Sequence, residues 1–451
     1  MITTEENVSS STTILVPESE KTTGLSWAET LSVEDILSKD QLKAQNHYIN
    51  VIKVSIERDL AAFVFGAGVS VPSGMPMWSG LISQMFGYSL QNKFLNETSS
   101  MISLEKIAKL QENNSVANKL INKEIKLLGN VNSLESAEYV AQFFMDDSAE
   151  EWVKNKLSEL AIATMVSKLI DKSHTPEALF EKDVHSCTRL LAEEVADTTP
   201  SVVAKKNTMF AVSYLMAAEK GIHRAMTYNY DPLVQEHMME LYGIPHDRIL
   251  THPSNWNKSP TSGGNREIYH VHGFVKGQRH NKPNHESVYP GSDQSGPLVL
   301  SEDSYYRIEQ REAYNWSSSI QSYFLNKYNC IFVGFSADDY NFRRIIRQLG
   351  DSMSLAKPPE ERTASNSYPL HYLVLGIGGL LNDVYESVCK SYRKNGHNMN
   401  TTEEKQAQQE TIFLMQNILE SRARYWKRFG VVPIWVTTEE IPELLVSFLE
   451  K

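Results

Sequence analysis

Short apolar runs alternate with helical segments along this chain. Most runs end at a turn-forming residue and are typical of buried strands; they cover Ala61–Phe65, Arg224–Thr227, Glu267–His272, Cys330–Gly334, His371–Gly376 and Val431–Val436. Three- to four-residue periodicity predicts helices over 33–59, 401–428 and 441–449. Strands that alternate with helices favour a mostly parallel sheet covered on both faces, so the pattern predicts an α/β fold.

Residues 81–220 interrupt this alternation with helical periodicity and no convincing strand. We predict a large α-helical insertion there, which either mediates assembly or simply packs over the sheet. Residues 1–25 are polar and rich in Ser and Thr, which predicts a flexible arm. The sheet domain is then formed by 26–80 and 221–451.

Composition narrows the function classes. The chain has 451 residues, 41% of them apolar, and a formal net charge of −11. An acidic surface disfavours strong nucleic-acid binding by the chain itself. Three scattered cysteines exclude a disulfide framework and a four-cysteine zinc site, and they suit a reducing cytosol. We find neither a signal peptide nor an apolar run long enough to span a bilayer, so we predict a cytoplasmic protein without a membrane segment.

A glycine motif follows the first predicted strand. Gly66, Ala67, Gly68 and Ser70 stand where a backbone without Cβ atoms can approach a phosphate. Val71 takes the last glycine position of the G-x-G-x-x-G fingerprint, so the motif is incomplete. A strand-end turn that needs glycine for its geometry is the alternative interpretation.

Polar residues also follow the second predicted strand, in the order Thr227, Asn229 and Asp231. Residues at i and i+2 of an extended chain lie on one side, which brings an amide and a carboxylate together at the carboxyl edge of the sheet. Alternatively, Asp231 caps the helix that Pro232 begins. Both interpretations can hold together.

Two further strand ends carry candidate chemistry. His272 precedes a glycine, and an imidazole there can act as a general base near neutral pH. Gly334 and Ser336 repeat the pattern of a strand, a glycine and a hydroxyl. For each motif alone, a structural role is the more frequent outcome.

Taken in order, these motifs resemble the sirtuin family. They read Gly-Ala-Gly-x-Ser-x-x-x-Gly-x-Pro, Thr-x-Asn-x-Asp, His-Gly and Gly-x-Ser, in scattered blocks between Ala61 and Ser336. The resemblance implies a Rossmann-like, doubly wound sheet that binds NAD. It implies that Gly66, Ala67, Gly68 and Ser70 line the pyrophosphate and nicotinamide side, and that Gly334 and Ser336 contact the adenosine half.

The resemblance also implies catalytic roles. Asn229 and Asp231 would hold the nicotinamide ribose and carboxamide, with Thr227 beside them, and His272 would be the general base. Met77-Trp78-Ser79 replaces the Asp-Phe-Arg of protein-deacylating sirtuins, although Trp78 would still cover the nicotinamide. The zinc module of those enzymes has no counterpart here, so we expect no metal, and water becomes the favoured acceptor.

The pattern therefore resembles bacterial sirtuin-like effectors of anti-phage defence, which destroy NAD, more than it resembles the protein-deacylating sirtuins. We predict an NAD glycohydrolase that forms a homo-oligomer, with a HerA-type ATPase as the partner that this family implies. The alternatives are an NAD-dependent protein deacylase, a non-catalytic module that binds NAD or ADP-ribose and gates a larger assembly, and a scaffold built on the helical insertion.

Overall fold

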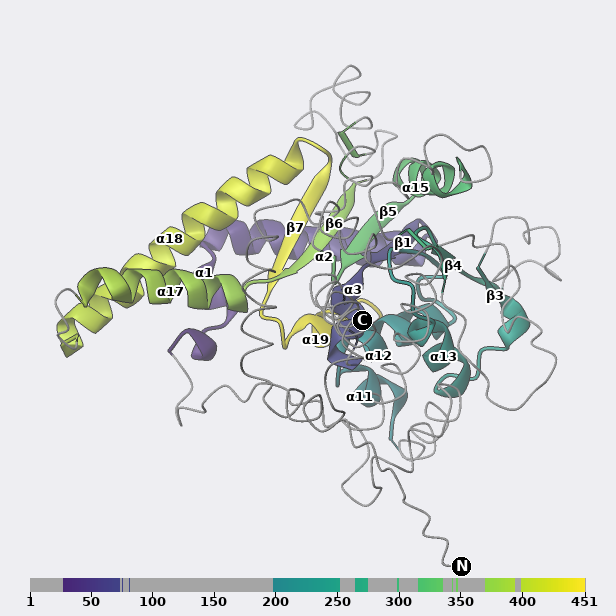
Figure 1. Cartoon of the computed structure of the whole chain (residues 1–451), viewed down its shortest axis with the longest axis horizontal. Helices are drawn as coiled ribbons and strands as arrows, with labels where there is room; N and C mark the ends of the chain where they lie inside the picture. Colours follow the sequence, from purple (N-terminus) through teal and green to yellow (C-terminus); the bar gives the residue numbers. More distant parts are fainter. Residues whose placement is uncertain are drawn as a thin grey trace, which may run out of the picture.

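The computed structural model describes residues 27–73, 75, 81, 198–251, 264–274, 298–299, 315–335, 343, 346–347, 370–393 and 399–450. These residues form a parallel sheet with helices on both faces (Figure 1). The predicted α/β, Rossmann-like class is confirmed.

The sheet contains seven strands among the described residues, in the order β3-β4-β2-β1-β5-β6-β7, and every neighbouring pair is parallel. Their bounds are β1 Ala61–Phe65, β2 Arg224–Thr227, β3 Ile249–Leu250, β4 Arg266–His270, β5 Asn329–Val333, β6 His371–Gly376 and β7 Val431–Val436. Six correspond to predicted runs. The two-residue β3 was missed because it is too short to show a period.

Helices connect the strands and flank them. The α-helices are α1 Val33–Ile36, α2 Lys39–Glu57, α3 Ala67–Ser70, α11 Pro200–Ala204, α12 Thr208–Ala217, α13 Leu233–Glu240, α15 Asn315–Lys327, α17 Gly378–Tyr392, α18 Thr401–Lys427 and α19 Ile441–Ser447. Short 3-10 turns are η1 Trp27–Thr30, η2 Val71–Ser73 and η3 His246–Arg248. Asn400 is the N-cap of α18, and its side chain accepts hydrogen bonds from two backbone N–H groups of the first turn.

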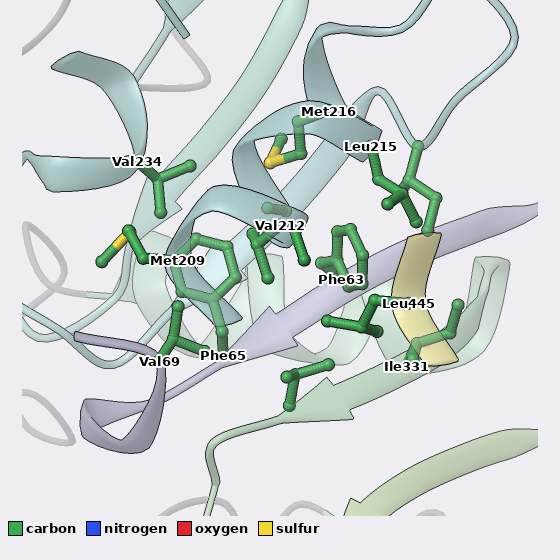
Figure 2. Close-up of a cluster of buried hydrophobic side chains, with 14 of the residues drawn as sticks. Phe63, Phe65, Val69, Met209, Val212, Leu215, Met216, Val234, Ile331 and Leu445 are labelled. Carbon is green, nitrogen blue, oxygen red and sulfur yellow. The ribbon is translucent and has the colours of Figure 1, made fainter. Parts of the chain in front are cut away.

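The larger core lies on the face of the sheet that α12, α13 and α19 cover. Phe63 and Phe65 of β1 point into it and are 0% and 2% exposed (Figure 2). Residues of α12 surround them, and Leu445 of α19 closes one side. Burial of large aromatic and aliphatic side chains contributes roughly 1.5–3 kcal/mol each, so this cluster fixes β1 beneath α12.

The opposite face carries the alternate residues of the same strands. Val64 of β1 and Phe332 of β5 pack beneath Phe324 of α15. Farther along the sheet, Trp435 of β7 packs against Leu381 of α17 and Leu419 of α18. Burial on both faces explains why the strands are continuous apolar runs rather than alternating patterns.

The strand order creates a switch point between β1 and β5. From β1 the chain fills one half of the sheet with β2, β3 and β4, and it then crosses to place β5, β6 and β7 on the other side. The carboxyl ends of these two strands therefore mark the position where ligands bind in open α/β sheets.

The predicted arm and most of the predicted helical insertion lie outside the described residues. The arm at 1–25 lies outside the described residues, as do residues 82–197 of the predicted insertion. The last part of the predicted insertion contains α11 and α12, and α12 is buried against the sheet. Among the helices described, none has the length and apolar character that crossing a bilayer requires.

Candidate active site

The candidate site lies at the carboxyl edge of the sheet, where β1, β2, β4 and β5 end side by side. Val333 of β5 accepts a hydrogen bond from Gly66 N–H at 3.3 Å, and Phe65 of β1 accepts one from Tyr228 N–H at 3.1 Å. Thr227 of β2 accepts one from Val271 N–H at 3.0 Å. The parallel ladder therefore continues past the strand ends and brings the four loops together.

The glycines after β1 and β5 contact each other directly. Gly68 N–H donates to the Gly334 carbonyl at 2.9 Å. A Cβ atom added to Gly68 would lie 2.8 Å from Gly334 Cα, and one added to Gly334 would lie 2.3 Å from Val69 N. Gly334 also has φ +59°, which glycine adopts without strain. Loop-to-loop packing is therefore one reason for these glycines.

Ser70, Asn229 and Asp231 form a hydrogen-bonded chain. Asn229 Nδ2 donates to Ser70 Oγ at 2.9 Å, and Ser70 Oγ donates to Asp231 Oδ2 at 2.9 Å. Their exposed fractions are 1%, 7% and 8%. The hydroxyl thus joins the segment after β1 to the segment after β2, and it orders an amide, a hydroxyl and a carboxylate within one buried cluster.

The carboxylate of Asp231 has an altered proton affinity. Burial raises its pKa to about 6, and hydrogen bonds from Ser70 and from backbone N–H groups oppose that rise. One of these bonds comes from Leu233 N–H, which donates to Asp231 Oδ1 at 3.2 Å at the start of α13. The prediction that Asp231 caps a helix beginning at Pro232 is wrong in its position, because α13 begins at Leu233 and Pro232 is the N-cap. Asp231 precedes the cap, and its carboxylate binds the N–H of the first helical residue while it also joins the polar cluster. Its charge state changes close to neutral pH.

Thr227 supports the cluster from the end of β2. Its Oγ1 donates to the Phe65 carbonyl at 3.1 Å and accepts from Asn229 N–H at 3.0 Å, and the side chain is fully buried. The Thr227 hydroxyl thus makes both of these hydrogen bonds to the protein backbone. Thr227 fixes where Asn229 leaves the strand.

His272 lies two residues beyond the end of β4, because β4 ends at His270 rather than at the predicted residue 272. Its ring meets Tyr228 edge-on, with the ring centroids 4.7 Å apart, and the residue is 5% exposed. Tyr228 in turn donates to Gln321 Oε1 at 2.6 Å. His272 is thus adjacent to the Asn229 segment through Tyr228, on the side of the sheet that α15 covers.

His270 is a site-supporting residue that sequence reasoning missed. Its Nδ1 lies 2.7 Å from the Asn229 carbonyl oxygen, and its Nε2 lies 2.6 Å from Gln235 Nε2. Burial lowers its pKa to about 4. The motif His270-Val271-His272 contains the signal, but spacing alone does not reveal which ring contacts Asn229.

The structure describes some of the remaining residues predicted to bind NAD and not others. Gly66 and Ala67 begin the turn after β1 as predicted, with Gly66 as the N-cap of α3. Trp78 and Ser336 lie outside the described residues. No group of three or more His, Cys, Asp or Glu side chains suited to a metal ion occurs within the described ranges. The expectation of a zinc-free site stays a prediction.

Comparison with known families points to the same part of the chain. Residues 223–374 match the family model of the SIR2-like domain. This match supports a sirtuin-like family. The matched range runs from the residue before β2 into β6, and it contains Asn229, Asp231, His272 and Gly334.

SIR2-like domains use NAD, so the sirtuin-like match supports an NAD-dependent enzyme. The first glycine motif and Ser70 precede the matched range, and the structure brings Ser70 into contact with residues inside it. No curated protein matches the chain.

Proposed function

We propose that this chain is an NAD glycohydrolase, which cleaves NAD into nicotinamide and ADP-ribose. The observation that carries the proposal is the buried chain of Asn229, Ser70 and Asp231 beside the switch point of a Rossmann-like sheet. The SIR2-like match over residues 223–374 supports NAD as the substrate.

Cleavage of the nicotinamide–ribose bond develops positive charge on the ribose. The reaction needs little covalent assistance, so positioning and electrostatics can supply most of the catalysis. In the proposal, the Asn229 amide orients the ribose or the attacking water. Asp231 stabilises the cationic ribose or binds the carboxamide, and His272 accepts the proton of the water.

The residues fit this assignment chemically. Asn229 offers an amide and Asp231 a carboxylate, and both are desolvated, which strengthens their interaction with a developing charge. Ionised Asp231 is the form that stabilises a cation. Because burial raises its pKa to about 6, the proposal requires turnover to decline as the pH falls through that value.

The test is incubation of the purified protein with NAD, with and without an acetyl-lysine peptide, followed by chromatography of nicotinamide and ADP-ribose. Turnover without peptide supports the glycohydrolase. Strict dependence on the peptide would identify a deacylase, and tight binding without turnover would identify a binding module.

Substitutions link the activity to the site. Asn229→Ala and His272→Ala should each abolish hydrolysis while the protein remains folded. Asn417→Ala and His47→Ala are matched controls at exposed helical positions, and they should retain full activity. Wild-type turnover by a folded Asn229 or His272 variant would refute the assignment.

We further propose that the enzyme is a cytoplasmic, NAD-depleting effector of bacterial anti-phage defence, acting as a homo-oligomer with a HerA-type ATPase. The resemblance to such effectors supports this role. Cells that carry the wild-type chain should lose NAD on phage infection, and cells that carry Asn229→Ala should not. Co-purification with the ATPase tests the partner.

A further inference from the structure

His270 connects three elements of the candidate site although it is 1% exposed. It is the last residue of β4, its Nδ1 contacts the Asn229 carbonyl after β2, and its Nε2 contacts Gln235 on α13. Its ring also packs on Phe274, with the ring centroids 4.5 Å apart. Both ring nitrogens therefore have partners inside the protein.

These partners determine the tautomer of the ring. A carbonyl oxygen only accepts, so Nδ1 must carry the proton and donate to Asn229. Nε2 is then the acceptor, and the amide nitrogen of Gln235 is its donor. With the Gln235 amide in this orientation, protonation of Nε2 would bring two donors face to face, and burial of the ring also disfavours its charged form. His270 is therefore neutral, and both of its ring nitrogens are bonded within the protein.

The bond from Nδ1 fixes the backbone of Asn229 from one side. From the other side, Thr227 Oγ1 accepts from Asn229 N–H at 3.0 Å. Both peptide groups next to the Asn229 Cα atom are thus held by buried partners. The direction of the Asn229 side chain toward Ser70 depends on these two bonds.

We propose that His270, held by Gln235, is a positioning residue that aims the Asn229 amide into the NAD-cleaving site. This inference rests on the proposed function. It predicts that loss of the Nδ1 donor impairs the chemical step, because a misdirected Asn229 costs more in the transition state than in the bound substrate.

Two amide variants of His270 separate this role from packing. Asparagine places its amide nitrogen near the Nδ1 position and can still donate to Asn229, whereas glutamine places its amide near Nε2. We expect His270→Gln to lower kcat on the order of tenfold or more, with little change in KM. We expect His270→Asn to retain kcat within about threefold.

His371 provides a matched control. It is also 1% exposed and lies at the start of β6, where Nδ1 accepts from Cys330 N–H at 3.2 Å. His371→Asn and His371→Gln report what burying an amide costs in stability, and their kcat values should not separate. Equal kcat for His270→Asn and His270→Gln in folded protein would overturn the positioning role.

Hydrogen exchange of the segment 227–233 gives a readout that needs no NAD. Its amides include those of Tyr228, Asn229 and Leu233, which have protein acceptors. Exchange should quicken in His270→Gln and remain slow in His270→Asn. If the wild-type chain does not cleave NAD, the proposed function fails, and this exchange contrast still supports or overturns the positioning of Asn229.

Discussion

The buried carboxylate of Asp231 makes the stability of the protein depend on pH. Its pKa is about 6 in the folded protein and 3.8 is the ordinary value, so the folded state binds a proton more tightly than the unfolded state does. The contribution of Asp231 to the stability of the fold is then fully present below the ordinary pKa, and it is lost as the pH rises through the pKa of the folded state. A shift of about two units corresponds to about 3 kcal/mol at roughly 1.4 kcal/mol per unit.

Asp231→Asn removes this titration with little change in shape. Subtracting its free energy of unfolding from that of the wild type isolates the contribution of Asp231. We expect this difference, wild type minus variant, to fall by about 2 kcal/mol between pH 4.5 and 8. The fall is smaller than the full change of about 3 kcal/mol, because part of the titration lies below about pH 4.5. The same substitution should abolish NAD turnover, because an amide cannot supply the negative charge.

Urea unfolding followed by circular dichroism at several pH values measures the difference. Asp383→Asn is the control, because Asp383 lies exposed on α17. A difference that stays constant with pH would refute the burial argument, and one of opposite sign would mean that hydrogen bonds from Ser70 and Leu233 outweigh desolvation.

Three further predictions concern the same loops. Gly334→Ala should lower the free energy of unfolding in urea by more than about 2 kcal/mol, because a Cβ atom would lie 2.3 Å from Val69 N. The control Gly243→Ala, at φ +66° with open space around it, should lower it by only about 1 kcal/mol. Equal losses for the two variants would contradict the steric argument. Ser70→Ala removes a hydrogen bond that lowers the pKa of Asp231, so the acidic limb of the pH–rate profile should move to higher pH. An unchanged limb would show that Ser70 does not control the Asp231 charge. Asn229→Ala and His272→Ala should lack NAD hydrolysis by chromatography, against the exposed controls Asn417→Ala and His47→Ala.

Local sequence signals were sufficient for most of the sheet. Runs such as Ala61–Phe65 and Val431–Val436 are buried on both faces, so every residue is apolar and the strand is visible without neighbours. The placement of Asn229 and Asp231 after β2 also follows from the pattern, because turn-forming polar residues mark the strand end. The expectation that Asp231 contacts both the start of the next helix and a polar cluster was also accessible from the pattern, although the N-cap itself is Pro232.

The contacts among the strand ends could not be predicted in this way. Ser70 and Asp231 are 161 positions apart, and their hydrogen bond exists only because β1 and β2 pair in a particular register. Gly68 and Gly334 likewise meet because β5 pairs with the other edge of β1. A pattern read along one chain carries no information on register between distant strands.

His270 and His272 show most clearly which features the sequence predicts and which it does not. Alternation along a strand that reached residue 272 would put His270 and His272 on one face of the sheet. The strand ends at His270, and the following turn directs one ring toward Gln235 of α13 and the other toward Tyr228. The sequence by itself determined where β1, β2, β4 and β5 lie and that Asn229 and Asp231 follow β2, because burial dictates the apolar composition of these strands and turn-forming polar residues mark their ends. Only the tertiary structure decided which side chains face each other there, because hydrogen-bond geometry depends on strand register and on where each strand ends.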